Sequence, residues 1–189
     1  MKKGCFIFAG ILILLIIVSG AWFISGYNKV AKLDEAVKAG WRQVDTVLQR
    51  RYDLIPNLVN TVKGYATHEK EIFTEITRLR SQWASAGTGQ EKMKAAGELE
   101  GAISRLLVVA ENYPDLKASE NFLSLQAQLE GTENRIAVQR MRYNETVQTF
   151  NTYIRTFPGN IFAGIRGLSE PAPYFEAEEK ARKVPKVEF

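Results

Sequence analysis

The sequence has 189 residues, a formal net charge of +4 and 24% charged residues. That length suits one ordinary domain, and no Lys or Arg run is long enough for a nucleic-acid patch, so no nucleic-acid partner is expected. The single cysteine, Cys5, excludes a disulfide within the chain, and the single histidine, His68, argues against most metal and nucleophilic-triad chemistries.

The first predicted element is an apolar segment over residues 5–26, which follows a short basic N-terminus at residues 1–4. Its core is an uncharged run of 20 residues, Cys5–Ile24. A helix rises about 1.5 Å per residue, so this run spans roughly 30 Å, the thickness of a bilayer core. A transmembrane anchor with the lipid bilayer as its partner is therefore predicted. Three aromatic residues at its far end suit the membrane interface: Trp22, Phe23 and Tyr27.

The alternative for this segment is a cleaved signal peptide, with Val18-Ser19-Gly20 before Ala21 as the cleavage site. The apolar run continues past that site through Trp22-Phe23-Ile24, which favours an uncleaved anchor. Orientation is nearly balanced, because lysines flank both ends of the segment. The resemblance of the first residues to a secretory signal favours an inner-membrane protein whose helical domain is periplasmic.

A long amphipathic helix is predicted next, and only Ser25-Gly26 separates it from the anchor. Its apolar residues recur in steps of three and four that average close to 3.5, the spacing of a helix that presents one seam to a partner. We expect some 55 residues without a break, ending in the small-residue loop at 84–89. The seam consists of Val30, Leu33, Val37, Trp41, Val44, Leu48, Tyr52, Ile55, Val59, Val62, Ala66, Phe73, Ile76 and Trp83.

A proline, Pro56, lies inside this predicted helix. It lacks the N–H that bonds back along the helix, which costs roughly 3 kcal/mol in an exposed helix interior. We expect the surrounding fold to offset that cost, and we predict that Pro56 bends the helix.

Two further helices are predicted, over about 90–112 and from Ser119 to Phe157. Pro114 stops the first, because the residue before a proline is pushed out of helical space. The second carries aromatic or aliphatic residues at intervals of seven: Phe122, Leu129, Ile136, Tyr143, Phe150 and Phe157. These patterns, with no alternating strand pattern, predict an all-α fold in which the long helices form an antiparallel bundle.

Several segments of the sequence resemble the LemA family of bacterial membrane proteins. They are Arg50-Arg51-Tyr52-Asp53-Leu54-Ile55-Pro56-Asn57-Leu58-Val59, Val62-Lys63-Gly64-Tyr65-Ala66, Glu133-Asn134-Arg135-Ile136, Tyr143-Asn144 and Tyr174-Phe175. The resemblance covers essentially the whole chain. It implies a single-pass membrane protein with a LemA-like helical bundle at 27–168. It also implies no known catalytic activity and an association with membrane proteases of the HtpX type or with TPM-domain proteins. The tail at 169–189, which is broken by Pro171 and Pro173 and ends in residues of balanced charge, is expected to be loosely ordered unless a partner binds it.

Charged and amide residues within the two longest helices suggest a structural polar layer between them. If these helices pair antiparallel, the groups fall at comparable heights, and we predict that Arg50 or Arg51 pairs with Glu130 or Glu133. The alternative is that these charges are solvated, as most charged residues are. A docking surface also stays open as their role. The predicted layer comprises Arg50, Arg51, Asp53, Asn57, Glu130, Glu133, Arg140 and Asn144.

The chemistry-bearing residues favour a non-enzymatic function without metal or cofactor. His68-Glu69-Lys70-Glu71 lacks the second histidine of a zinc-binding helix, and neither His68 nor Cys5 has the companions that catalysis requires. The first hypothesis is a membrane-anchored envelope scaffold that forms homo-oligomers through coiled-coil-like contacts. The alternative is an adaptor or modulator of a membrane protease in envelope quality control.

Overall fold

The computed structural model describes residues 2–175, and within this range the chain is helical without any strand, which confirms the all-α prediction. The described chain divides into two compact units. Of the described residues, unit 1 comprises 2–39 and 144–172, and unit 2 comprises 40–143 and 173–175. The helices are α1 (Lys2–Lys63), α2 (Lys70–Ser85), α3 (Gly89–Ala110), α4 (Pro114–Lys117), α5 (Glu120–Arg155) and α6 (Gly159–Arg166).

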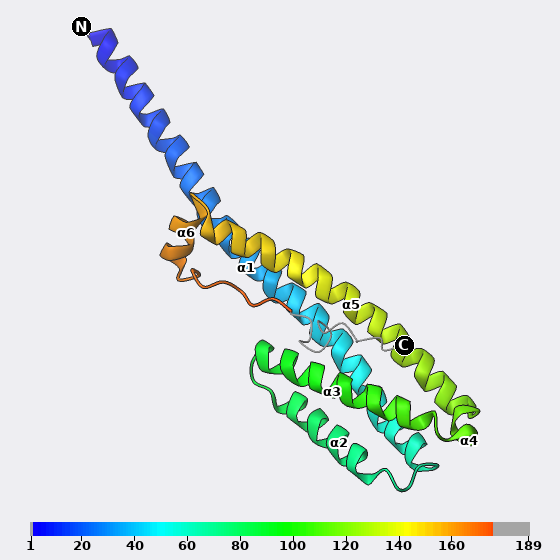
Figure 1. Ribbon diagram of the computed structural model, residues 1–189. Helices are drawn as coiled ribbons and strands as arrows, with labels where there is room; N and C mark the ends of the chain where they lie inside the picture. Colours follow the sequence, from blue (N-terminus) through cyan, green and yellow to red (C-terminus); the bar gives the residue numbers. More distant parts are fainter. Residues whose placement is uncertain (1, 176–189) are drawn as a thin grey trace, which may run out of the picture. The chain divides into compact units, whose positions relative to one another are not determined.

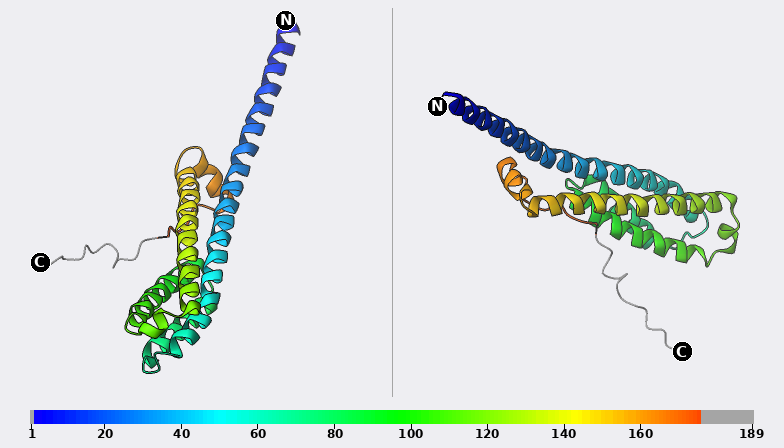
Figure 2. Two further views of the ribbon diagram at one scale, coloured as in Figure 1. Left: turned by 90° about the vertical axis from the view of Figure 1, so that its right-hand side faces the viewer. Right: turned by 90° about the horizontal axis from the view of Figure 1, so that it is seen from above.

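Helix α1 runs without interruption through Ser25-Gly26, so the apolar segment and the amphipathic segment are one helix. Within each unit, α1 and α5 lie side by side and run in opposite directions (Figure 1, Figure 2). Pro56 is half-buried inside α1, which continues past it to Lys63. The bend at Pro56 stays a prediction.

The N-terminal part of α1 exposes an unbroken apolar surface. An 18-residue window there has a mean hydropathy of 2.1 and none of it is buried, which makes this the one candidate membrane-spanning helix in the part of the chain that the structure describes. Every residue from Ile11 to Ile24 is exposed. Soluble monomers rarely expose so much contiguous apolar surface, so this segment requires an apolar environment.

The prediction of one amphipathic helix reaching residue 84 is wrong, because α1 ends at Lys63 and α2 begins only at Lys70. Gly64 follows the last helical residue, and glycine is about 1 kcal/mol worse than alanine in a helix. The chain turns there through a hydrogen bond from the Ala66 amide to the Val62 carbonyl (2.9 Å). The apolar spacing conceals this break because Ala66 within it and Phe73 after it are both buried.

Helices α2 and α3 form an antiparallel hairpin in unit 2 (Figure 1). A capping box starts α3: the Glu91 amide donates to Thr88 Oγ1 (3.2 Å), and the Thr88 amide donates to Glu91 Oε2 (3.0 Å). These reciprocal bonds satisfy two amides that the helix itself leaves without partners. They also hold the pKa of Glu91 below its usual 4.5. The hairpin contributes a row of buried residues to unit 2: Phe73, Ile76, Leu79, Trp83, Ala95, Ala96, Leu99, Ala102, Ile103 and Leu106.

The seven-residue pattern of α5 matches its buried stripe over most of the helix. Phe122, Leu129, Ile136, Tyr143 and Phe150 are all buried. Phe157 was expected to continue the stripe but is 76% exposed. Helix α5 ends at Arg155, so Phe157 no longer follows the helical period that would turn it inward. The short helix α4, which starts at Pro114, was not predicted.

Helix α6 packs against α1 and against the end of α5 in unit 1, and one glycine permits each approach. A Cβ on Gly26 would lie 2.1 Å from the Phe162 ring. A Cβ on Gly159 would lie 2.1 Å from the Tyr153 carbonyl oxygen, which is backbone and cannot rotate away. Each of these positions therefore accepts only glycine without local rearrangement.

Alanine substitutions at Gly159 and Gly164, the two glycines within α6, test this packing. We expect Gly159→Ala to destabilise unit 1 because its Cβ collides with the Tyr153 backbone. Gly164→Ala is the matched control, because nothing lies within 4 Å of its Cβ. The control should be neutral or should stabilise α6 by up to about 1 kcal/mol through helix propensity. Amide hydrogen exchange of α6 measures both effects, and equal protection in the two variants would contradict the packing.

Candidate functional site

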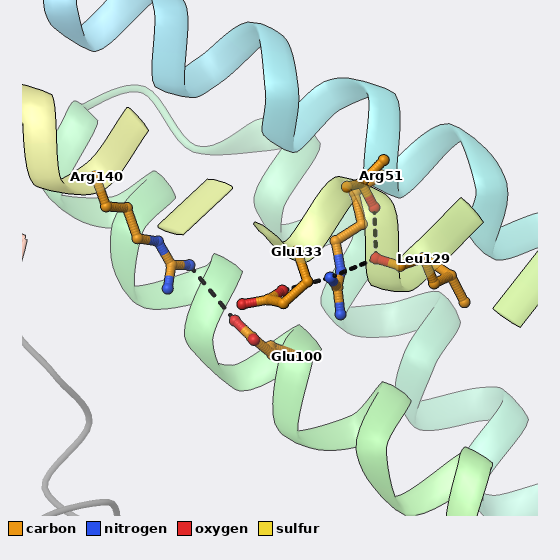
Figure 3. A network of polar contacts seen from close by, with 6 residues as sticks. Arg51, Glu100, Leu129, Glu133 and Arg140 are labelled. Atoms are coloured by element: carbon orange, nitrogen blue, oxygen red, sulfur yellow. Dashed lines mark hydrogen bonds and ion pairs between the residues drawn. The ribbon is translucent and has the colours of Figure 1, made fainter. Parts of the chain in front are cut away.

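Arg51 of α1 is the buried charge around which the candidate site of unit 2 is built. Its side chain is only 8% exposed and forms an ion pair with Glu133 of α5 (Figure 3). Its Nη1 also donates to the Leu129 carbonyl oxygen at 3.2 Å. Because a guanidinium group is charged at all physiological pH values, burial requires such partners. The Arg51–Glu133 pair is one of the four pairings that the sequence suggested.

Glu100 of α3 and Arg140 of α5 extend this pair into a network (Figure 3). Arg140 Nη2 lies 3.4 Å from Glu100 Oε2, and both side chains are about three-quarters buried. The carboxyl groups of Glu100 and Glu133 lie next to each other between the two guanidinium groups (Figure 3). We call Arg51, Glu100, Glu133 and Arg140 the charge network. It connects α1, α3 and α5.

The surroundings of Glu133 in the charge network change the pKa of its carboxyl group. Burial raises the pKa of Glu133 above its usual 4.5, and the neighbouring Glu100 carboxylate raises it further, while Arg51 and Arg140 oppose the shift. Adjacent carboxylates disfavour simultaneous ionisation. Burial also raises the pKa of the neighbouring Tyr52 hydroxyl. Glu133 therefore binds a proton more readily than an isolated glutamate would.

The other residues of the predicted polar layer lie outside the charge network. Asp53 accepts a hydrogen bond from Gln49 Nε2 (2.7 Å) and Glu130 accepts one from Gln126 Nε2 (3.4 Å), both on their own helices. Asn144 is half-buried in unit 1. Four members of the predicted layer have exposed side chains: Arg50, Asp53, Asn57 and Glu130.

Glu100 is a member of the charge network that the predicted polar layer lacks, although the sequence contains a signal for it. Glu100 follows Ala96 by four positions and precedes Ile103 by three, and both of these residues are buried. Residues at such spacings share one face of a helix. Glu100 therefore lies beside the apolar seam of α3, where a carboxylate needs a partner.

An aromatic cluster adjoins the Arg140 end of the network within unit 2. The Arg140 guanidinium lies 4.9 Å from the Phe175 ring centre, and the rings of Trp41 and Phe175 are 5.8 Å apart. The Tyr143 hydroxyl donates to the Pro173 carbonyl oxygen at 3.0 Å. Residues 173–175 are thus held on α1 and α5 of unit 2. The remainder of the predicted tail, 176–189, lies outside the described residues.

A second polar link joins α1 to the hairpin of unit 2. Lys92 Nζ lies 2.9 Å from Asp45 Oδ1 and 5.1 Å from the Trp83 ring centre. Trp83 in turn packs edge-on against Tyr52, with ring centres 4.6 Å apart. A cavity of about 230 Å³ opens beside these groups. Its lining combines Gln49, Tyr52, Arg80, Ser81, Trp83, Ala84 and Lys92.

The geometry of the charge network suits a structural role in fixing helix register. Two cations and two carboxylates compensate one another, and the partners come from three helices. Among the residues whose placement the structure describes, no group of three or more His, Cys, Asp or Glu residues converges as a metal site. Deleting one partner of a buried pair commonly costs about 3–5 kcal/mol, because the other charge is stranded.

Fold and site together define an all-α protein with one candidate membrane-spanning helix and a charge network that joins three helices of its bundle. The LemA family model matches residues 40–189 of this chain. The chain therefore belongs to the LemA family, which confirms the resemblance of the sequence motifs.

Individual relatives agree with this assignment. Magnetosome protein MamQ 2 of Paramagnetospirillum magneticum is 27% identical to this chain over 87% of the chain and 70% of its own length. Magnetosome protein MamQ of Magnetospirillum gryphiswaldense is 25% identical over 79% of the chain and 65% of its own length. Protein LemA of Metamycoplasma hominis is 24% identical over 85% of the chain and 73% of its own length.

Removal of the buried arginine should destabilise unit 2. Arg51→Met keeps much of the apolar volume but strands Glu133 beside Glu100. Because Glu133 is 36% exposed, solvent screens part of the penalty, and we expect a loss of about 2–3 kcal/mol. Chemical denaturation measures the loss. Arg50→Met is the matched control, because Arg50 is exposed. Equal stability of the two variants would contradict the assigned role of Arg51.

The raised pKa of Glu133 predicts a pH dependence of stability. A carboxyl group with a higher pKa in the folded state binds its proton more tightly when folded, so stability rises as pH falls through that pKa. The gain should appear on lowering the pH from neutral and be complete near the usual value of 4.5. Glu133→Gln cannot titrate and should lack this component. Denaturation series of both proteins across this range test it, and parallel curves would contradict the assignment.

Proposed function

We propose that this LemA-family protein is a membrane-anchored, non-enzymatic helical scaffold of the bacterial envelope that self-associates. The observation that carries the proposal is the exposed apolar surface of α1 from Ile11 to Ile24. Lipid is the environment that satisfies such a surface on a helix, because the helix already pairs its own backbone groups. Within the proposal the protein crosses the plasma membrane once, with its helical domain on the periplasmic side.

The anchor is part of a folded unit, which supports a scaffold over a loosely tethered domain. In unit 1, Trp22 and Phe23 at the end of the apolar segment pack edge-on against Phe162 of α6, each with ring centres 5.4 Å apart. The Arg166 side chain donates to the Tyr27 carbonyl oxygen at 2.8 Å. A span held by such contacts fixes the adjoining helices relative to itself. These contacts involve all three aromatic residues predicted as interface anchors.

Exposed apolar side chains on α5 support self-association. Leu123, Val138 and Met141 are 50%, 41% and 55% exposed, and they lie on the side of α5 opposite its buried stripe. An α-helix places residues 18 apart at the same angular position, so Leu123 and Met141 lie in line. A second copy of this chain offers the same surface, which suits a symmetric interface. The relatives named as magnetosome proteins support a role in an assembled structure.

The alternative role, as adaptor or modulator of a membrane protease of the HtpX type, stays a prediction, as does a TPM-domain partner. It depends largely on the tail, most of which lies outside the described residues. Crosslinking in cells separates the two proposals. The scaffold predicts crosslinks between copies of this chain, and the adaptor predicts crosslinks to a protease.

Oligomeric state in lipid nanodiscs or detergent tests the scaffold proposal. We expect the full chain to run as an oligomer in light scattering and Met141→Lys to shift it toward monomer, because the lysine charge must be desolvated at the contact. Gln128→Lys is the matched control, at an exposed polar position on another side of α5. A wild-type chain that is monomeric at every concentration would overturn self-association. Equal effects of the two lysine substitutions would overturn the assignment of this side of α5 as the contact between copies.

A further inference from the structure

Helix α6 and the turn before it carry three large apolar side chains that the fold leaves exposed. Phe157, Ile161 and Ile165 are 76%, 49% and 55% exposed. Ile161 and Ile165 are one helical turn apart, so they lie on one side of α6. Helix α6 has eight residues and also buries Phe162 and Ala163, so little of its exposed surface is polar. Exposed apolar surface of this density marks a contact with a partner or a membrane.

The buried side of α6 contacts α1, and this contact determines where α6 lies along the length of α1. Phe162 packs against Trp22 and Phe23, which are among the last residues of the apolar run, and it fills the space that a side chain at position 26 would occupy. Both helices belong to unit 1. The exposed side chains of α6 therefore lie beside the place where the exposed apolar surface of α1 ends.

Cationic and hydroxyl groups lie next to the end of the exposed apolar surface of α1. The Arg166 guanidinium lies 3.8 Å from the Tyr27 ring centre. The Lys29 ammonium lies 4.7 Å from the Tyr153 ring centre, and the Tyr153 hydroxyl donates to the Gly26 carbonyl oxygen at 3.4 Å. Aromatic side chains with polar tips, and cations on long stems, are the groups that proteins place at lipid headgroup depth.

We propose that Phe157, Ile161 and Ile165 insert into the interfacial layer of the bilayer, so that α6 is a second, monotopic membrane contact beside the span. This inference rests on the membrane attachment proposed above. Lipid is the partner that we infer for the exposed side of α6, because this side adjoins the apolar surface of α1 that lipid must already cover. An amphipathic helix with apolar residues on one side and a cation, Arg166, in its last turn suits this position.

Site-directed spin labelling of the full chain tests the insertion. Cys5→Ser removes the native thiol, and single cysteines are then introduced by Ile161→Cys, Ile165→Cys, Leu14→Cys and Gln148→Cys. All four positions are exposed, so the labels do not disrupt packing. The protein is reconstituted in nanodiscs that hold one copy. Collision of the nitroxide with oxygen, which concentrates in lipid, is compared with collision with a water-soluble nickel chelate.

We expect the oxygen-to-nickel ratio at 161 and 165 to exceed that at 148 several-fold and to approach that at 14. Values at 161 and 165 equal to that at 148, with a lipid-like value at 14, would overturn the inference and leave the membrane span intact. An aqueous value at 14 would overturn the membrane attachment itself. Protection of 161 and 165 only in discs with two copies would identify a second chain as the occupant and also overturn the inference.

Discussion

The ion pair between Arg51 and Glu133 is the constraint on which the arrangement of unit 2 depends. A guanidinium that is 8% exposed must keep its partners, because a stranded buried charge costs several kcal/mol. Arg51 meets both the Glu133 carboxylate and the Leu129 carbonyl oxygen, which are one turn apart on α5. A slip of α1 by one helical turn, about 5.4 Å, would separate it from both. An apolar seam alone penalises such a slip far less.

The network also carries a cost. Arg51 Nε and Arg140 Nε are buried and make no hydrogen bond within the described part of the chain, and the two glutamates lie side by side. Buried ion pairs are often no more stabilising than apolar residues of the same volume. The arrangement is therefore better explained by register than by stability. Glu100 extends the same constraint to α3, so that one group of charges aligns three helices.

The helical class, the apolar seams and the family could be predicted from the sequence, because helical spacing and motifs are local properties of the chain. It also singled out Arg51 and Glu133, since charges within a seam need partners. It did not reveal the turn after Lys63, because the spacing stays in phase across Gly64. It overestimated the polar layer, since Asp53 and Glu130 find partners on their own helices. Glu100 was missed because its partner comes from another helix.

A double-mutant cycle on Arg51 and Glu133 tests the register claim most directly. Arg51→Met, Glu133→Met and the double variant are compared with the wild type by chemical denaturation. We predict that each single variant is destabilised and that the double variant recovers much of the loss, with a coupling energy of about 1–3 kcal/mol. Additive losses, with no recovery in the double variant, would contradict the claim that this pair holds α1 and α5 in register.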